Sequence, residues 1–408
     1  MNIPKIYDVR GIIRVVILVV ILSGQGLWDA RAAPLTSVAF VDPNLQQCIQ
    51  RVAQVRGWTD TLQVISLTCQ RSGITSLEGL GVLTNLARLN LSDNEIDDLT
   101  PLSGLIGLTL LDVSNNTFEE LTPLAGLTNL QSLSVANAFV FDLAPLAGLI
   151  NLAQLNVSDN EIEDPAPLAS LINLRSLVLS NTFIFDLAPL ASLINLVRLD
   201  VSFNAIADLA PLSGLINLSE LYLNFNEIDS LAPLAGLVNL VQLDVSVNFI
   251  EDLTPLAGLI NLSRLTLADN RVSNLAPLAG LTKLTSLDAS INTIADATPL
   301  GGLTNLTALA LGDNLISTLG ALGQLVNLTQ LDVSSNTIAA LAPLAGLTRL
   351  TELVLANNLL VDINPLMGLS QLQFADLSGN IDVPCDQVIA LQAARAGLLI
   401  HPPIACLS

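Results

Sequence analysis

The feature that most constrains this chain is a motif that recurs every 22 residues, without insertion or deletion, from residue 86 to residue 380. Asn fills the position of Asn94 in 12 of 14 units, and the exceptions are Ala138 and Thr182. Pro fills the position of Pro101 in 12 of 13 units, with Ala321 as the exception. A unit this short cannot bury its own leucines, so neighbouring units must stack and share one core.

The recurring positions predict the path of the chain within each unit. Leu89 and Leu91 flank a polar residue, and this alternation predicts a short strand with one buried face. Asn94 turns the chain off the strand, and Pro101 suits the start of a tight 3-10 turn on the convex side. The pattern L-x-x-L-x-L-x-x-N is that of a leucine-rich repeat, so we expect a right-handed α/β solenoid, a horseshoe with a parallel concave sheet. About 15 strands would span roughly 70 Å.

The position of the repeat divides the chain into four segments. We predict a signal peptide at 1–32, an N-terminal cap at 33–83, about 14 repeats at 84–383 and a C-terminal cap at 384–408. The leader has a basic start, an apolar run and a small-x-small cleavage signature that ends at Ala32. Its apolar run is shorter than the ~20 residues of a membrane helix, and an uncleaved anchor is the alternative. We therefore expect a secreted or cell-surface protein that does not span a membrane after cleavage, with the periplasm as the alternative location.

Both ends of the array need a cap, because the end of a solenoid exposes core. Asp42 and Pro43 are typical of the start of a helix. Its predicted inward face comprises Leu45, Cys48, Ile49, Val52 and Val55. A second helix is predicted from Asp386 to Ala396, with Val388, Ile389 and Leu391 facing inward.

The four cysteines lie only in these end segments, as two pairs that are each 21 residues apart. Bonds within each cap would staple the frayed ends in an oxidising compartment. The other two connectivities would join opposite ends of a rod of roughly 70 Å, which is beyond the reach of a disulfide. A metal site is the alternative, but it would lack histidine ligands. We predict Cys48–Cys69 and Cys385–Cys406, and no cofactor.

The 22-residue unit with Asn-x-Ile-x-Asp-Leu-x-Pro-Leu resembles that of the internalin family of bacterial leucine-rich repeat proteins. The predicted capping helix and the segment from Ile74 to Leu80 are similar to the lead-in of that family. The resemblance covers roughly residues 40–383. It implies a bacterial protein of the cell surface or exterior that binds a partner, often a host protein, on its concave face.

Charge narrows the class of partner. The chain has 36 Asp and Glu against 15 Lys and Arg, a formal net charge of -21, which argues against binding nucleic acid. Asp recurs on alternate predicted strands of the concave face, at positions that include Asp200, Asp244 and Asp288. These carboxylates would stand ~10 Å apart, too far to share a proton or a Ca²⁺ ion. They form either a solvated polar face or an acidic strip that steers a basic partner.

Aromatic residues gather in the middle repeats, where eight lie between residues 139 and 249. The register places Phe203 and Phe225 just before the Asn column and Tyr222 on the concave face. Phe139, Phe183 and Phe249 follow the Asn column. Together these residues predict an exposed edge for a protein partner. The alternative is that a local shift turns one Phe of the pairs 139/141 and 183/185 into the core, or that Phe203, Tyr222 and Phe225 are packed rather than displayed.

We thus predict a non-enzymatic module that binds a protein, a host or cell-surface protein being one class, with a glycan as the alternative ligand. His401 stands alone, so no Ser-His-Asp set is available, and the unbroken repeat leaves no inserted loop for a pocket. The alternative function is structural, a self-associating protein of the cell envelope or matrix. The oligomeric state is not predicted.

Overall fold

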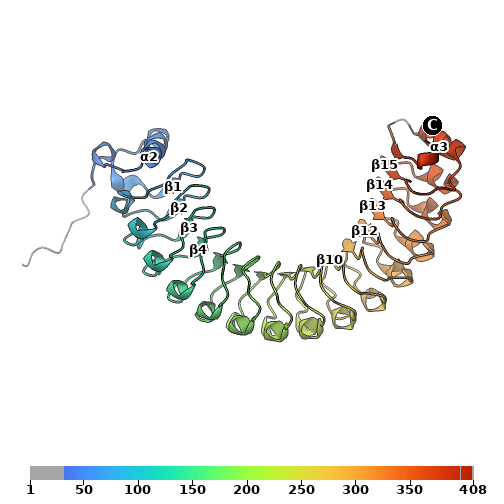
Figure 1. The fold of residues 1–408 in the computed structure, drawn as a ribbon, viewed down its shortest axis with the longest axis horizontal. Helices are drawn as coiled ribbons and strands as arrows, with labels where there is room; N and C mark the ends of the chain where they lie inside the picture. The colour runs from blue at the N-terminus through green and yellow to red at the C-terminus, as the bar shows by residue number, and fades with distance from the viewer. Residues whose placement is uncertain (1–31, 396, 407–408) are drawn as a thin grey trace, which may run out of the picture.

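The computed structural model describes residues 32–395 and 397–406. Residues 1–31 of the predicted leader (1–32) lie outside the described residues. The chain winds into an open arc with α2 (Pro43–Arg56) at one end and α3 (Cys385–Ala394) at the other, as Figure 1 shows. The strands line the inside of the arc and the 3-10 turns line its outside (Figure 1). The predicted horseshoe solenoid is confirmed.

One parallel sheet of 16 strands runs through the whole arc in sequence order. Each strand is short and, as far as β15, pairs with the equivalent residues of the following repeat, for example Leu199 with Leu221. The strands are β1 Ser66–Thr68, β2 Arg88–Asn90, β3 Leu110–Asp112, β4 Ser132–Ser134, β5 Gln154–Asn156, β6 Ser176–Val178, β7 Arg198–Asp200, β8 Glu220–Tyr222, β9 Gln242–Asp244, β10 Arg264–Thr266, β11 Ser286–Asp288, β12 Ala308–Ala310, β13 Gln330–Asp332, β14 Glu352–Val354, β15 Phe374–Asp376 and β16 Leu399–His401.

The convex side consists of short 3-10 turns, as the Pro column predicts. In most of them Pro stands at the first or second position, where its fixed φ fits and no backbone N–H is needed. The turns of the repeats are η3 Leu80–Val82, η4 Thr100–Leu102, η5 Thr122–Leu124, η6 Ala144–Leu146, η7 Ala166–Ser170, η8 Ala188–Ser192, η9 Ala210–Gly214, η10 Ala232–Gly236, η11 Thr254–Leu256, η12 Ala276–Leu278, η13 Thr298–Gly302, η14 Gly320–Gln324, η15 Ala342–Gly346 and η16 Asn364–Gly368. The caps add η1 Leu35–Ser37, η2 Thr61–Gln63 and η17 Ile404–Cys406.

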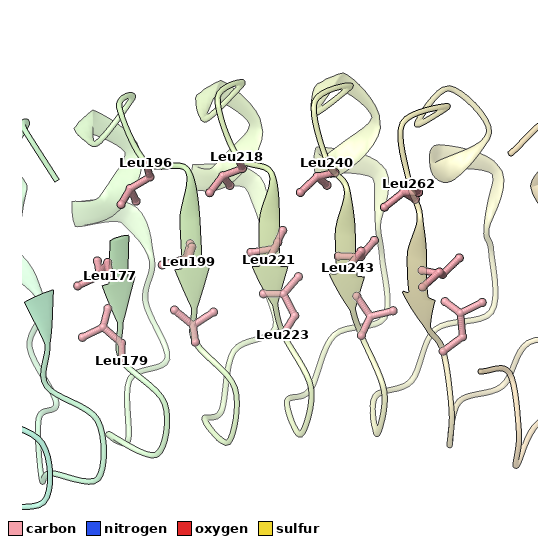
Figure 2. Packing of buried hydrophobic residues seen from close by; sticks show 14 of the residues in the cluster. Leu177, Leu179, Leu196, Leu199, Leu218, Leu221, Leu223, Leu240, Leu243 and Leu262 are labelled. Atoms are coloured by element: carbon pink, nitrogen blue, oxygen red, sulfur yellow. The ribbon is translucent and has the colours of Figure 1, made fainter. Parts of the chain in front are cut away.

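Leucine columns fill the space between the sheet and these turns. In Figure 2, Leu196, Leu218, Leu240 and Leu262 form one row before the strands, and the strand leucines form further rows beside it. These side chains are fully buried, and each packs against its equivalents in the adjacent repeats. The core is therefore one continuous column that follows the arc.

Two turns of every repeat form the sides of the arc. We call the turns after the strands, residues 92–99 and their equivalents in the other repeats, the post-strand flank. The turns before the strands, residues 103–109 and their equivalents, form the pre-strand flank. The chain crosses from one flank to the other along each strand, from top to bottom in Figure 2.

The N-terminal cap begins with the predicted helix. Asp42 accepts hydrogen bonds from the N–H groups of Asn44 (2.7 Å) and Leu45 (2.9 Å) at the start of α2. The Asp42 side chain also accepts from the N–H groups of Thr75 (2.7 Å) and Ser76 (3.2 Å), which ties the helix to the first repeat. The predicted Cys48–Cys69 disulfide is present. One predicted core residue is wrong: Val55 is 81% exposed, and Ala53 is buried in the last part of the helix instead.

The C-terminal cap is more elaborate than predicted. Helix α3 starts at Cys385, and the Cys385–Cys406 disulfide is present. Val388 and Leu391 are buried as predicted, whereas Ile389 is 68% exposed because it lies on the outer face of the helix. The tail then adds β16 beside β15, which makes 16 strands where about 15 were expected. Within the described residues, no helix is both long and apolar enough to cross a membrane.

Candidate partner-binding surface

The post-strand flank has an unusual backbone position just before the Asn column. Residues there have positive φ in every repeat from Asp93 to Gly379, a conformation that suits Gly, Asn and Asp. Asn or Asp fills the position in eight repeats, namely Asp93, Asn115, Asn137, Asp159, Asn181, Asp269, Asp313 and Asn357. Phe203 and Phe225 occupy it with φ of 56° and 57°. A bulky residue in this conformation is strained by about 1–2 kcal/mol. Val247 and Ile291 occupy the same column in other repeats, so what distinguishes Phe203 and Phe225 is their exposed aromatic rings.

The two rings stack on each other in the open. Their centroids are 4.2 Å apart and their planes differ by 12°, while Phe203 and Phe225 remain 50% and 46% exposed. Stacking holds both rings in fixed positions and so reduces the entropy that a partner must overcome on binding. The residues next to the Asn column thus form a rigid apolar surface of the kind that anchors protein interfaces.

The Phe pairs earlier in the array are also displayed. Asn137 and Asn181 stand in the ordinary positive-φ column, so the register continues without a shift. Ala138 and Thr182 therefore take the buried Asn position, and Val140 and Ile184 fill the core behind it. All four rings point outward, and their exposed fractions are 57% for Phe139, 54% for Phe141, 63% for Phe183 and 65% for Phe185.

Carboxylates lie beside two of these rings, those of Phe141 and Phe183. Phe141, Phe183, Glu161, Glu163 and Asp164 line a recess of about 680 Å³ on the post-strand flank. Further along, Phe249 is 44% exposed, and the guanidinium of Arg271 lies over its ring with Cζ 4.8 Å from the centroid. A phenyl face beside carboxylates is a favourable environment for a cationic side chain.

The centre of the concave face contains a cluster that the sequence did not reveal. Arg198 on β7 donates from Nη1 to Glu220 Oε2 (2.7 Å) and to the hydroxyl of Tyr222 (3.2 Å), both on β8. Its Cζ also lies 4.5 Å from the centroid of the Tyr222 ring. Partial desolvation lowers the pKa of Arg198, but the hydrogen bonds to Glu220 and Tyr222 outweigh it and raise that pKa above its ordinary value. These contacts with the neighbouring strand fix the half-buried Tyr222 at the middle of the sheet.

The recurring Asp residues of the concave face have a local structural role. Oδ1 of Asp200, Asp244 and Asp288 accepts from both the N–H and the hydroxyl of the Ser two residues later, with O···O distances of 2.6–2.7 Å. This arrangement orders the start of the post-strand turn. Oδ2 of Asp200 also lies 3.8 Å from Nη2 of Arg198. These carboxylates therefore stabilise the repeat locally and form a polar lining of the concave face.

A second acidic column precedes the Pro positions and also serves the backbone. Asp98, Asp142 and Asp208 each accept from the N–H two residues later at 2.7–2.8 Å, where the 3-10 turn begins. Among residues 32–395 and 397–406, no three His, Cys, Asp or Glu side chains lie close enough together to hold a metal ion.

The predicted site residues therefore fall into two adjoining areas. Phe139, Phe183, Phe203, Phe225 and Phe249 lie on the post-strand flank, and Asp200, Tyr222, Asp244 and Asp288 lie on the strands of the concave face. Arg198 and Glu220 were missed, because a single Arg and a single Glu in successive repeats give no signal until β7 and β8 are paired. The positive-φ column could have been found, since Asn and Asp dominate it.

Comparison with known proteins supports this architecture. A family model described as leucine-rich repeats (2 copies) matches residues 194–236, 216–258 and 326–367. A leucine-rich repeat protein of Leptospira interrogans is 25% identical, with a TM-score of 0.76, over 83% of this chain and 96% of that one. The plant peptide hormone receptor RGFR1, solved in complex with RGF2, shares the fold at 22% identity, with a TM-score of 0.66, over 78% of this chain and 58% of that one.

The comparison that shows the family of this chain is with an internalin of Listeria monocytogenes. Its crystal structure matches with a TM-score of 0.71, and the alignment covers 85% of this chain and 98% of that one. Leucine-rich repeat solenoids of this kind generally mediate protein binding. With 32% sequence identity over that span, the chain belongs to the internalin family of leucine-rich repeat proteins.

Proposed function

We propose that this protein is a secreted, non-enzymatic binding module that captures a protein partner on the post-strand flank and the adjoining concave face. The observation that carries the proposal is the stacked pair Phe203 and Phe225, two exposed rings at strained backbone positions. Two exposed, stacked rings that the core does not require support a functional role for these side chains. Membership of the internalin family and the two disulfides support a location outside the cytoplasm.

The surroundings of the rings define the chemistry of the partner. Carboxylates line the recess between Phe141 and Phe183, and the whole chain has a net charge of -21. A complementary partner presents apolar side chains for the rings and Lys or Arg for the carboxylates. A host or cell-surface protein with a basic patch fits this description better than a neutral glycan does.

The test is a binding screen with a matched pair of variants. The purified chain is presented to arrays of extracellular proteins and of polysaccharides, beside the double variant Phe203→Asn/Phe225→Asn and the variant Val247→Asn. Val247 occupies the same positive-φ column with φ of 53°, so its replacement relieves similar strain without removing a ring. We expect a protein ligand whose binding is lost in the double variant and retained in Val247→Asn. Equal binding by all three proteins, or ligands found only among the polysaccharides, would contradict the proposal.

A further inference from the structure

The pre-strand flank carries a row of exposed aliphatic side chains that lies outside the proposed partner-binding surface. Six consecutive repeats place one such residue at the same position of the turn, with exposed fractions of 47–56%. The row consists of Ile150, Ile172, Ile194, Ile216, Val238 and Ile260. We call it the aliphatic row. Its members stand two residues before the buried leucines of the same turns, among them Leu196, Leu218 and Leu240, which Figure 2 labels.

The backbone beneath the aliphatic row is rigid. The residue after each aliphatic side chain is Asn, and its Nδ2 donates to a carbonyl of the preceding repeat. Asn195 donates to the carbonyl of Ile172, Asn217 to that of Ile194 and Asn239 to that of Ile216, each at 2.9 Å. A preformed surface of this kind loses little entropy when it is covered.

The pre-strand flank is free of carboxylates in a strongly acidic protein. Its turns, residues 81–87 and their equivalents in each repeat up to 367–373, contain no Asp or Glu. In the six turns that carry the aliphatic row, the only charged residue is Arg175. A basic partner gains nothing here, whereas a second copy of a chain with a charge of -21 can approach along this flank without bringing carboxylates together.

The curvature of the arc favours the same occupant. The aliphatic row follows the arc seen in Figure 1, so a straight partner would contact only part of it. A two-fold axis that is parallel to a radius of the arc and lies in the contact plane places the pre-strand flanks of two copies face to face, with both arcs curving in the same direction. If the axis passes between Ile194 and Ile216, Ile194 of one copy contacts Ile216 of the other. Every other member of the row then also faces a member of the row on the second copy.

The size of the contact is sufficient for a specific dimer. In each of the six turns between residues 147 and 263, the two leucines are buried and the other five residues reach solvent. Six turns with five such residues give 30 residues, against the roughly 20–30 that each side of a standard interface uses. We propose that two copies of this chain associate through the aliphatic row as a closed two-fold dimer, which leaves both post-strand flanks free for partners.

Sedimentation of the purified full chain across the micromolar range tests this proposal. We expect the mass to rise from one chain to two and then to stay constant. The variant Ile194→Thr/Ile216→Thr should weaken association about tenfold or more, because apolar surface is lost from the centre of the interface on both copies. Thr already stands at this position in five other repeats, at 84, 128, 282, 304 and 348, so the variant keeps a residue the fold accepts.

A charge exchange tests the two-fold axis itself. Copies with Ile194→Glu/Ile216→Glu and copies with Ile194→Lys/Ile216→Lys should each be monomeric, and a mixture of the two should form heterodimers. Leu315→Glu is the matched control, because Leu315 is 57% exposed on the post-strand flank, where Glu95, Glu161 and Glu227 hold the same repeat position. The control should dimerise like the unaltered chain. A single-chain mass at every concentration, growth beyond two chains, or dimers of the Glu variant alone would each overturn the proposal. Binding by the Phe203 and Phe225 region is measured separately, so failure of one proposal does not affect the other.

Discussion

The two flanks of this solenoid are built from the same 22-residue unit, yet they present opposite chemistry. The post-strand flank carries Phe203, Phe225 and many carboxylates, and its backbone passes through a positive-φ residue in each repeat. The pre-strand flank carries aliphatic side chains, has no carboxylate and contains no non-Gly residue with positive φ among the described residues. A repeat protein can thus offer two independent surfaces, because each strand separates its two turns by the width of the sheet.

Asn side chains stabilise the turns of both flanks. The burial of each Asn should determine how much it contributes to the free energy of unfolding. Asn226 is buried, accepts from the N–H of Ile206 (3.0 Å) and donates to the carbonyls of Val201 and Leu223 (3.0 Å each). Asn217 is exposed and donates to the carbonyl of Ile194. We expect Asn226→Ala to lower the free energy of unfolding by about 2–3 kcal/mol, because buried backbone groups lose their partners.

The matched variant Asn217→Ala should cost only about 0.5–1 kcal/mol, because water replaces an exposed partner. Denaturant unfolding monitored by circular dichroism measures both values. Ala138 already occupies the buried Asn column in one repeat, so Asn226→Ala should fold. Equal losses for the two variants would contradict the distinction between the flanks.

Acid should lower the stability of the N-terminal cap, because the carboxylate of Asp42 links the cap to the first repeat. Burial of Asp42 opposes its charge, but hydrogen bonds from Thr75, Leu45 and Ser76 outweigh this and lower the pKa of Asp42 below its ordinary value of 3.8. A lowered pKa in the folded state means that the stabilisation is present above the unfolded pKa and is lost as the pH falls through the folded value. We expect Asp42→Asn to lower the free energy of unfolding by about 1–2 kcal/mol at neutral pH, because the uncharged amide cannot accept the hydrogen bonds from the N–H groups of Thr75 and Ser76 as the carboxylate does. The deficit relative to the unaltered chain should shrink below about pH 4, in thermal melts recorded across the range.

Salt should affect the two proposed interfaces differently. We propose that the partner on the post-strand flank contacts carboxylates, so its dissociation constant should rise severalfold between low and physiological ionic strength. Association through the aliphatic row has no carboxylate at the contact, so it should be unchanged or stronger in salt. Titration calorimetry for the partner and sedimentation for the dimer provide the comparison. A parallel salt dependence of both would show that the flanks do not act independently.

The smallest expected effect concerns stability at the stacked rings. Replacing Phe203 and Phe225 by Asn has two opposing effects on the free energy of unfolding. Relief of backbone strain at two positive-φ positions raises it, loss of the stacked pair lowers it, and each effect is worth about 1 kcal/mol. The free energy of unfolding should therefore stay within about 1 kcal/mol of the unaltered value, even though partner binding is lost. A much larger loss of stability would mean that the rings serve the fold.

Much of the architecture was determined by the sequence alone. The repeat period leads to the stacked sheet, the Asn and Pro columns to the two turns, and the spacing of four cysteines to both disulfides. These features are predictable because each unit contacts only its neighbours, so local periodicity already specifies the long-range contacts. The caps break this rule, which is why the burial of Val55 and Ile389 was mispredicted and β16 was missed.

Only the tertiary structure decided how side chains from different repeats combine. Arg198, Glu220 and Tyr222 form one cluster because β7 and β8 pair in register, and Phe203 stacks on Phe225 because the positive-φ turns align. The aliphatic row likewise becomes a surface only when six turns lie side by side. The sequence specifies the repeat through local forces, whereas surface chemistry depends on distances between side chains of successive repeats, and those distances exist only in the folded arc.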